Sequence, residues 1–316
     1  MSDNLIVSPS PHLHKDESVT SIMWMVVLSL VPAGIAATAI FGLSALRVTL
    51  VAIISAVLTE AIIQLSLRRS GKRLTVFDGS AFLTGLLLAY NLPPGVPIFM
   101  PVVGSIFAIA IAKHAFGGLG QNIFNPALAG RVFLMASWPA YMTNFPRPFT
   151  CDAITSATPL ALLKESKSLG QISYLDLFLG RHGGCIGEVC ILALLLGAIF
   201  LLIRGYISWH IPFSYVATCG LLAYIFGPQG FFSGDWLFHI LSGGLILGAF
   251  FMATDYVTCP LTRKGQLVFG IGCGLITMVI RLRGGYPEGV SYAILMMNAA
   301  TPLIDRYTRN RVYGTK

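Results

Sequence analysis

Charged residues are scarce in this sequence. Asp, Glu, Lys and Arg make up 11% of its 316 residues, whereas hydrophobic residues make up 55%. A soluble domain has roughly a quarter charged residues, so the chain cannot present an ordinary water-facing surface. The composition excludes a soluble globular protein and predicts a polytopic membrane protein. The formal net charge of +8 fits basic loops on one side of a bilayer better than it fits nucleic-acid binding.

Common catalytic and metal-binding motifs are also missing. The six cysteines contain no Cys-x-x-Cys pair, and the six histidines contain no pair at helical metal-ligand spacing, so no metal site is predicted. The sequence has neither a glycine-rich phosphate loop nor a nucleophile elbow. We expect the cysteines to be small apolar residues of membrane helices, with a cluster ligand from Cys151, Cys185 or Cys190 as the alternative. His182 is expected to be a solvated loop histidine, with contact to a polar ligand as the alternative.

The first segment, residues 1–20, lacks the features of a secretory signal peptide. It is polar and acidic, and it has no small-residue cleavage site after a short apolar run. We therefore expect a cytoplasmic N-terminal segment. The apolar run that follows, from Ile22 to Phe41, is long enough to cross a bilayer.

About twenty apolar residues are needed for a transmembrane helix. On this rule we predict about ten spans, near residues 22–41, 45–67, 79–91, 97–113, 123–138, 186–203, 211–226, 236–254, 266–281 and 289–303. The third is short and is followed by Asn91-Leu92-Pro93-Pro94, which predicts a broken or re-entrant helix. Non-helical backbone at that depth must be surrounded by protein or by a cavity.

The distribution of basic residues predicts the topology. With the N-terminus in the cytoplasm, thirteen of the 21 lysines and arginines lie on the cytoplasmic side, as the positive-inside rule requires. Both termini are then cytoplasmic and the long segment 139–185 lies outside. The predicted organisation is a first transmembrane repeat over 21–138, an extracytoplasmic loop over 139–185, a second repeat over 186–304 and a cytoplasmic tail over 305–316.

A faint internal repeat supports two related halves. Residues Gly79–Asn91 resemble Gly243–Asp255, and the pair Gly117-Gly118 has a counterpart in Gly284-Gly285. Because five spans precede the second copy, the halves would have opposite orientations, with a central site between them. The alternative is that two glycine-rich helices look alike by composition. The predicted fold is an all-α integral membrane protein of about ten helices, arranged as two inverted five-helix repeats.

Ionisable residues inside spans are costly and usually face a partner in the protein interior. Glu60, Asp78 and Asp255 are candidates to line an ion path, and Lys113, His114 and Arg131 also lie within or at the end of spans. The structural alternative is that Asp78 and Asp255 cap helix ends or act as interfacial anchors.

The longest polar interval, Thr143–Gly184, is too long for a turn and contains Asp152-Ala153-Ile154-Thr155-Ser156-Ala157-Thr158-Pro159-Leu160. This run resembles the flavinylation motif of the RnfD/NqrB membrane subunits of the Rnf and sodium-translocating NADH:quinone oxidoreductase complexes. Further matches to the family are Phe77-Asp78-Gly79-Ser80, the Asn91–Pro94 break, Gly117–Ala127 and Asn298–Asp305. Ser156 replaces the glycine that is common in the motif, and the chain length favours the Rnf branch.

The resemblance implies that Thr158 carries FMN through a phosphoester bond, with Asp152, Thr155, Ser156 and Ala157 completing the cofactor-binding motif. We expect the acceptor threonine on an exposed, narrow loop, outside the cytoplasm, where a flavin transferase can reach it. The phosphodiester charge would be offset by one of the cations Arg147, Lys164, Lys167 and Arg181. A second flavin, such as riboflavin, could bind between the halves.

In function, the resemblance implies a translocase subunit in a bacterial cytoplasmic membrane. Electrons would pass between ferredoxin and NAD, coupled to Na+ or H+ transport, with partners of the RnfA, RnfB, RnfC, RnfE and RnfG types. Two alternatives lack a redox cofactor. One is a small-solute channel or carrier of the urea-transporter type, whose fold the inverted repeat would match, and the other is a purely structural membrane anchor.

Overall fold

The computed structural model describes residues 18–66, 76–146, 148–149, 155–165, 173–227 and 230–309. In these ranges the chain is almost entirely helical. Its first half comprises α1 (Val19–Phe41), α2 (Leu43–Ser66), η1 (Val76–Asp78), α3 (Ser80–Tyr90), α4 (Phe99–Ile106), η2 (Phe107–Lys113), η3 (His114–Phe116), α5 (Pro126–Ser137) and α6 (Pro139–Met142). Its second half comprises α9 (Ile191–Ile203), α10 (His210–Ile225), α11 (Trp236–Leu241), α12 (Leu245–Leu247), η4 (Gly248–Met252), α13 (Arg263–Arg283) and α14 (Val290–Thr308).

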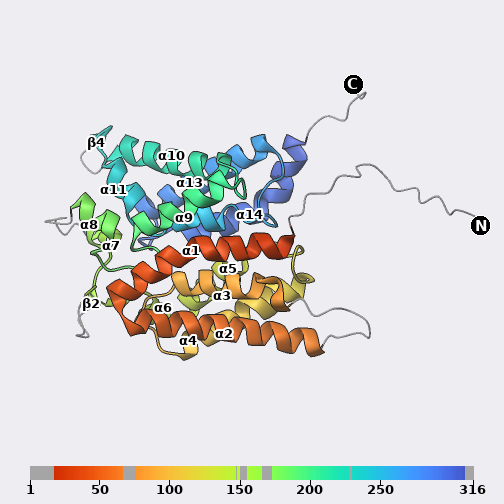
Figure 1. Cartoon of the computed structure of the whole chain (residues 1–316). Coiled ribbons are helices and arrows are strands. Elements are labelled where there is room, and N and C mark those ends of the chain that lie inside the picture. Colours follow the sequence, from red (N-terminus) through yellow and green to blue (C-terminus); the bar gives the residue numbers. More distant parts are fainter. Residues whose placement is uncertain are drawn as a thin grey trace, which may run out of the picture.

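Two short helices and two small hairpins complete the described fold. The helices α7 (Pro159–Lys164) and α8 (Tyr174–Leu179) lie between the halves in sequence. Strand β1 (Phe145–Pro146) pairs antiparallel with β2 (Thr155–Ser156), and β3 (Phe226–Gly227) pairs antiparallel with β4 (Gly230–Phe231). Figure 1 shows α7 and α8 at one end of the bundle and the start of α1 and the end of α14 at the other.

The helices of each sequence half lie together, and α1 packs against α9 where the halves meet (Figure 1). The packing is close: a Cβ at Gly197 of α9 would lie 1.9 Å from the backbone oxygen of Ser29 in α1. Only glycine fits such an approach, since any side chain would collide with that backbone. The largest hydrophobic cluster of the described residues runs through both halves, and two smaller clusters accompany it.

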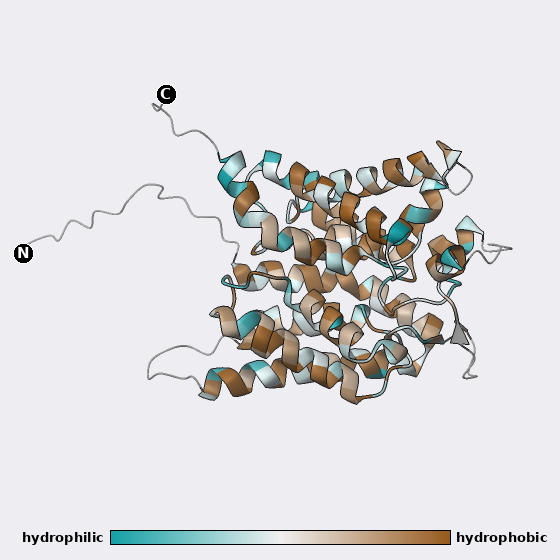
Figure 2. Cartoon of the chain, turned by 180° about the vertical axis from the view of Figure 1, so that it is seen from behind, coloured by the Kyte–Doolittle hydropathy of each residue, from teal (hydrophilic) through white to brown (hydrophobic). Residues whose placement is uncertain are grey.

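Four helical segments in the described ranges are long and apolar enough to cross a membrane: α1, α2, Phe99–Phe116 and α13. Shorter apolar helices are α3, α5, α9 and α10. Many large apolar side chains on the outside are exposed, including Ile35, Ile62 and Leu196, and Figure 2 shows hydrophobic residues over most of the bundle. Such an exposed apolar surface is stable against lipid and not against water. The structure therefore supports a multi-pass membrane protein, and the count of ten spans stays a prediction.

The third predicted span is a short buried helix. α3 has 11 residues, about 16 Å at the rise of an α-helix, roughly half the thickness of a bilayer core. It ends at a buried, non-helical run from Asn91 to Pro94. The segment 181–190 covers this run: the N–H of Gly187 donates to the carbonyl of Tyr90 at 2.9 Å, and that of Ile186 to Leu92 at 3.0 Å. These bonds supply the protein partners that non-helical backbone needs in a membrane.

Two predicted spans differ from the structure. The span predicted over 236–254 consists of α11, α12 and the π-helix η4, because Gly243 adopts a left-handed conformation (φ 70°) that interrupts the helix. The span predicted to begin at residue 186 begins at Ile191, because the residues before it cover the end of α3.

The proposed repeat receives mixed support. Gly79 and Gly243 both have positive φ and both precede short helices, as the match between their segments predicts. In the second match, Gly117 and Gly118 have positive φ whereas Gly284 is extended. The inverted repeat stays a prediction.

Candidate functional site

Residues 155–160, the described part of the run that resembles a flavinylation motif, lie at the end of the bundle that carries α7 (Figure 1). Asp152 falls outside the described residues. Thr155 and Ser156 form β2, where they pair with Pro146 and Phe145. Ala157 is exposed between this strand and α7.

Thr158 is the N-cap of α7. Its backbone is extended (φ −67°, ψ 153°), and its hydroxyl oxygen accepts a hydrogen bond from the N–H of Ala161 at 3.2 Å. Pro159 follows at the first helical position, where its fixed φ suits the start of a helix. The residue Thr158 is only 4% exposed, so the expectation of an exposed acceptor side chain is wrong for this conformation. The physical reason is the cap, which turns the hydroxyl towards the helix.

The two candidate cations that the structure describes bond to groups other than Thr158. Lys164 donates to the backbone carbonyls of Gly284 and Tyr286 and so ties α7 to the loop between α13 and α14. Arg181 is exposed and lies 3.9 Å from the carboxylate of Asp176. The candidates Arg147 and Lys167 lie outside the described residues.

A hollow of about 960 Å³ opens beside α7. Its walls combine apolar side chains with three cations and one carboxylate, among them Leu160, Leu163, Phe238, Lys164, Arg281, Arg283 and Asp235. An aromatic ring system with an anionic group would find complementary surfaces in such a hollow.

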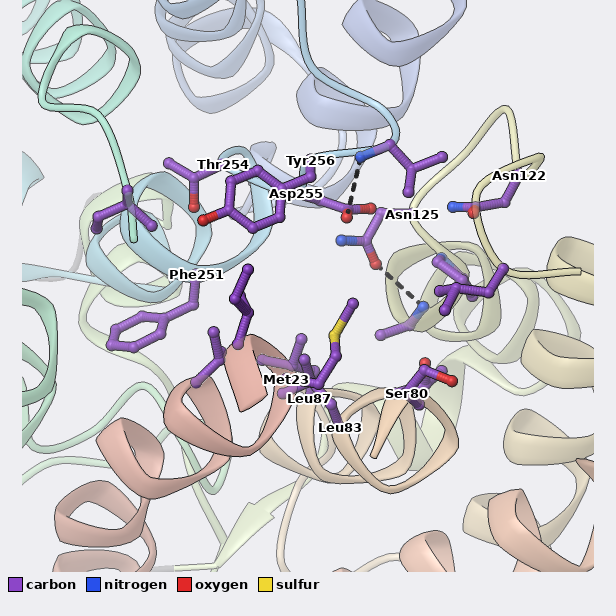
Figure 3. Close-up of a pocket in the computed structure, with 18 of the residues that line it drawn as sticks. Met23, Ser80, Leu83, Leu87, Asn122, Asn125, Phe251, Thr254, Asp255 and Tyr256 are labelled. Carbon is purple, nitrogen blue, oxygen red and sulfur yellow. Dashed lines mark hydrogen bonds between the residues drawn. The ribbon is translucent and has the colours of Figure 1, made fainter. Parts of the chain in front are cut away.

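A second pocket lies between the two halves (Figure 3). α1 contributes Met23, α3 contributes Ser80, Leu83 and Leu87, and the segment after η4 contributes Thr254, Asp255 and Tyr256. Asn122 and Asn125 add amides from the segment before α5. The apolar floor with a few convergent polar groups is typical of a small-molecule site.

The polar groups of this central pocket are held by local hydrogen bonds. The side-chain oxygen of Asn125 caps α5 by accepting from the N–H of Ala127 at 3.1 Å, and its nitrogen donates to the carbonyl of Met252 at 3.3 Å. Asp255 accepts from the N–H of Val257 at 3.4 Å and from the hydroxyl of Thr258 at 3.2 Å. Asp255 therefore closes a turn, which fits the structural alternative, and it also lines this pocket; its role in an ion path stays a prediction.

Glu60 forms a buried ion pair with Lys113. The Nζ–Oε2 distance is 2.6 Å, and the two side chains are 1% and 2% exposed. Lys113 also donates to the hydroxyl of Ser80 at 2.7 Å, and that hydroxyl donates to Asp78 at 2.6 Å. Asp78 also accepts from the backbone N–H of Ser80. This network gives Asp78 the role of stabilising the start of α3 and gives the buried Glu60 the cationic partner it requires.

Arg131 is buried at the centre of a cluster that sequence reasoning missed. Its guanidinium donates to Asn91 at 2.8 Å, to Ser291 at 3.1 Å and to Glu288 at 2.6 Å, and it lies 3.7 Å from the sulfur of Cys185. Glu188 is close to the same group. The sequence did offer one signal: Glu188 and Glu288 lie at or just before the starts of predicted spans, and a buried arginine such as Arg131 needs carboxylate partners.

His182 is buried rather than solvated. It is 7% exposed, and its Nδ1 lies 3.1 Å from the carbonyl of Gly183, because the segment 181–190 folds into the protein. Burial lowers the pKa of this imidazole. Cys185 and Cys190 are free thiols, and in the described ranges no group of three or more His, Cys, Asp or Glu residues could hold a metal ion.

Comparison with known proteins covers nearly the whole chain. The model of the NQR2, RnfD, RnfE family matches residues 6–314. The chain is 53% identical over 313 residues to the D subunit of the Na+-translocating ferredoxin:NAD+ oxidoreductase complex of Acetobacterium woodii, covering 98% of this chain and 96% of that one. It is 50% identical to the D subunit of the proton-translocating complex of Clostridium ljungdahlii, with 98% and 96% covered. It is 39% identical to the D subunit of an ion-translocating oxidoreductase complex of Escherichia coli, with 98% of each chain covered.

Proposed function

The chain belongs to the NQR2, RnfD, RnfE family, and on that premise we propose that it is the D subunit of an ion-translocating ferredoxin:NAD+ oxidoreductase complex. The family resemblance inferred from the motifs is thereby confirmed. The observation that carries the proposal is identity of 53% and 50% along nearly the full length to two D subunits of such complexes. The multi-pass apolar bundle supports placement in a bacterial cytoplasmic membrane, where the other Rnf subunits would surround it.

We propose that Thr158 carries FMN through a phosphoester. When bound, FMN accepts and passes on one or two electrons, and the chain orients it and sets its electrostatic surroundings. The local geometry is compatible with attachment, because an esterified Oγ1 remains an acceptor for the N–H of Ala161. The hydroxyl must first become accessible to a flavin transferase. Loss of an N-cap bond costs about 1 kcal/mol, which leaves an uncapped form well populated.

The surroundings of α7 would hold the tethered group. Leu160 and Leu163 border the hollow with an apolar wall, and Lys164, Arg281 and Arg283 border it with positive charge. These cations would compensate a phosphodiester and favour the electron-rich reduced state of the ring. Arg281 is already fixed, because it donates to the carbonyls of His239 at 2.6 Å and Ser242 at 3.0 Å.

The central pocket is our candidate for a second flavin, such as riboflavin. Its cavity is about 90 Å³ in this structure, below the roughly 300 Å³ of a small-molecule site, so the two halves would have to separate around the ring. Its apolar floor suits a planar ring, and the amides of Asn122 and Asn125 could bind the polar ring edge. Asp255 borders the same pocket and could also contribute to a cation path. Transport of a unit charge against 100 mV costs about 2.3 kcal/mol, which the electron transfer would have to supply. The two relatives named above belong to complexes that move different ions, Na+ in one and protons in the other.

Covalent attachment is tested by fluorescence of the denatured polypeptide under ultraviolet light, after co-expression with a flavin transferase. The wild-type band should fluoresce, since a covalent flavin survives denaturation. Thr158→Val should give a dark band. A matched control is Thr143→Val, which removes an exposed hydroxyl that bonds the carbonyl of Pro139 and should leave fluorescence unchanged. A dark wild-type band, or a fluorescent Thr158→Val band, would refute attachment at Thr158.

The comparisons do not support the solute-channel alternative. The relatives named above are subunits of oxidoreductase complexes. A channel would carry no flavin, so the same fluorescence experiment separates the two functions.

A further inference from the structure

Two buried glutamates face each other beside α7, and each has one oxygen without a hydrogen-bond donor. Glu188 is 4% exposed; its Oε1 accepts from the N–H of Cys185 at 2.8 Å, and its Oε2 has no partner. The side chain of Glu288 is 10% exposed; its Oε2 accepts from Arg131 at 2.6 Å, and its Oε1 has no partner. A buried carboxylate oxygen without a donor is costly, so this arrangement needs an explanation.

The two unpartnered oxygens converge on one turn of the chain. A Cβ at Gly244 would lie 3.0 Å from Oε2 of Glu188, and a Cβ at Gly243 would lie 3.4 Å from Oε1 of Glu288. Gly243 and Gly244 are consecutive, and their lack of side chains leaves room for both carboxyl groups. The glutamates are within hydrogen-bonding reach of each other when one of them is protonated.

The surrounding charges do not neutralise both carboxylates. Arg131 is the cation in contact, and its described donors are directed to Asn91, Ser291, Glu288 and the thiol of Cys185. Arg281 faces the same turn, but it donates to backbone carbonyls. Among the described residues, the thiol of Cys185 and the imidazole of His182 also interact with Glu288; burial raises the pKa of the first and lowers the pKa of the second, so both groups are held neutral. Lys164 lies at the same loop, where it donates to the backbone carbonyls of Gly284 and Tyr286. Two ionised carboxylates with one contacting guanidinium would leave a net negative charge in a buried site.

We propose that Glu188 and Glu288 share one proton and form a proton-binding site at the end of the bundle that carries α7. The hydrogen on Oε2 of Glu188 is donated to Oε1 of Glu288, which gives both oxygens a partner and balances the charge of Arg131. Paired carboxyl groups in a low-dielectric site cannot both ionise easily. Burial, reinforced by the negative charge of Glu288, raises the pKa of Glu188 to about 8, which agrees with this geometry.

A metal cation is the less suitable occupant. In the described ranges the site offers two carboxylates and no third His, Cys, Asp or Glu ligand arranged to hold a metal. The guanidinium of Arg131, already bonded to one of these carboxylates, would repel a second cation. A proton needs one donor and one acceptor oxygen, and the pair supplies both.

Infrared spectroscopy tests the site, since a protonated carboxyl group absorbs apart from a carboxylate. The chain contains five glutamates, so labelling with 13C-glutamate shifts the relevant band and identifies its origin. In the purified wild-type chain we expect a protonated glutamate band at neutral pH that declines by half near pH 8. The measurement is made without flavin attachment, so it is independent of the proposed function.

Substitutions of single glutamates identify which residues give rise to the infrared band. Glu188→Gln and Glu288→Gln should each remove it at neutral pH, because the remaining carboxylate can then pair with Arg131 alone. Glu165→Gln, at the exposed end of α7, is the matched control and should keep it. Persistence of the band in Glu288→Gln, with loss in Glu188→Gln, would show one isolated protonated acid and overturn the sharing.

If the variants do not fold, two measurements on the wild-type chain test whether Glu188 and Glu288 share a proton. Absence of a labelled band that titrates between neutral and alkaline pH would overturn the proposal. Loss of the band on addition of NaCl, but not of choline chloride, at constant pH would show that the pair binds Na+ instead of a proton and would also overturn it. A band that titrates near pH 8 and is unaffected by Na+ supports the proton site.

Discussion

The buried ion pair between Glu60 and Lys113 allows the loss of folding stability in a Glu60 variant to be predicted. The pair joins α2 to the end of η2, with an Nζ–Oε2 distance of 2.6 Å and side chains that are 1% and 2% exposed. Removing one partner of a buried pair leaves an uncompensated charge and costs about 3–5 kcal/mol. Glu60→Gln should therefore lower the folded-to-unfolded ratio by roughly 10²- to 4 × 10³-fold.

A double-mutant cycle separates the pair from its surroundings. Glu60→Met and Lys113→Met alone should each destabilise the chain strongly. The double variant should be much more stable than the sum predicts, because neither charge is left buried. The free energy of unfolding can be measured in detergent mixtures by tryptophan fluorescence. Additive losses of less than about 1 kcal/mol each would refute a buried pair. Normal stability of Glu60→Gln with a loss of ion transport in the complex would instead support a role of Glu60 in an ion path.

Two further variants test contacts between segments far apart in sequence. Arg131→Met should destabilise the chain by about 3–5 kcal/mol, because it leaves a buried carboxylate without its cation; equal unfolding curves for variant and wild type would contradict the observed cluster. Gly197→Ala should reduce the amount of folded protein measured by size-exclusion chromatography, because its Cβ would lie 1.9 Å from the oxygen of Ser29. Gly285→Ala is the control: the space around its new Cβ is open, so this variant should give a normal amount of folded protein in the same assay.

The apolar pattern of the sequence predicted the positions of most helices. Runs of apolar residues reflect the membrane environment directly, so α1, α2 and α13 were found within a few residues. The proline pair after Asn91 correctly predicted a break at a short helix. Apolarity alone could not show the interruption at Gly243, because a glycine inside an apolar run is compatible with a continuous helix or with a turn.

The candidate site was predictable only in part, because its contacts are distant in sequence. The motif around Thr158 is local and could be recognised, whereas the burial of Thr158 accompanies its N-cap in the folded chain and could not be inferred from the motif. Arg131 and Glu288 are 157 positions apart, and no periodic pattern links them. His182 was misjudged for the same reason, since the packing of segment 181–190 onto the end of α3 cannot be inferred from its polarity.

The hydrogen bonds from segment 181–190 to the end of α3 have a consequence for biosynthesis. A chain is made from its N-terminus, so Tyr90 and Leu92 leave the ribosome long before Gly187 and Ile186, which bond their carbonyls. Those carbonyls cannot remain unsatisfied in lipid. The first half must therefore stay at the membrane boundary, or be shielded by the insertion machinery, until residues 181–190 have been synthesised. A chain truncated before residue 181 would lack these partners and should be recognised by quality-control proteases.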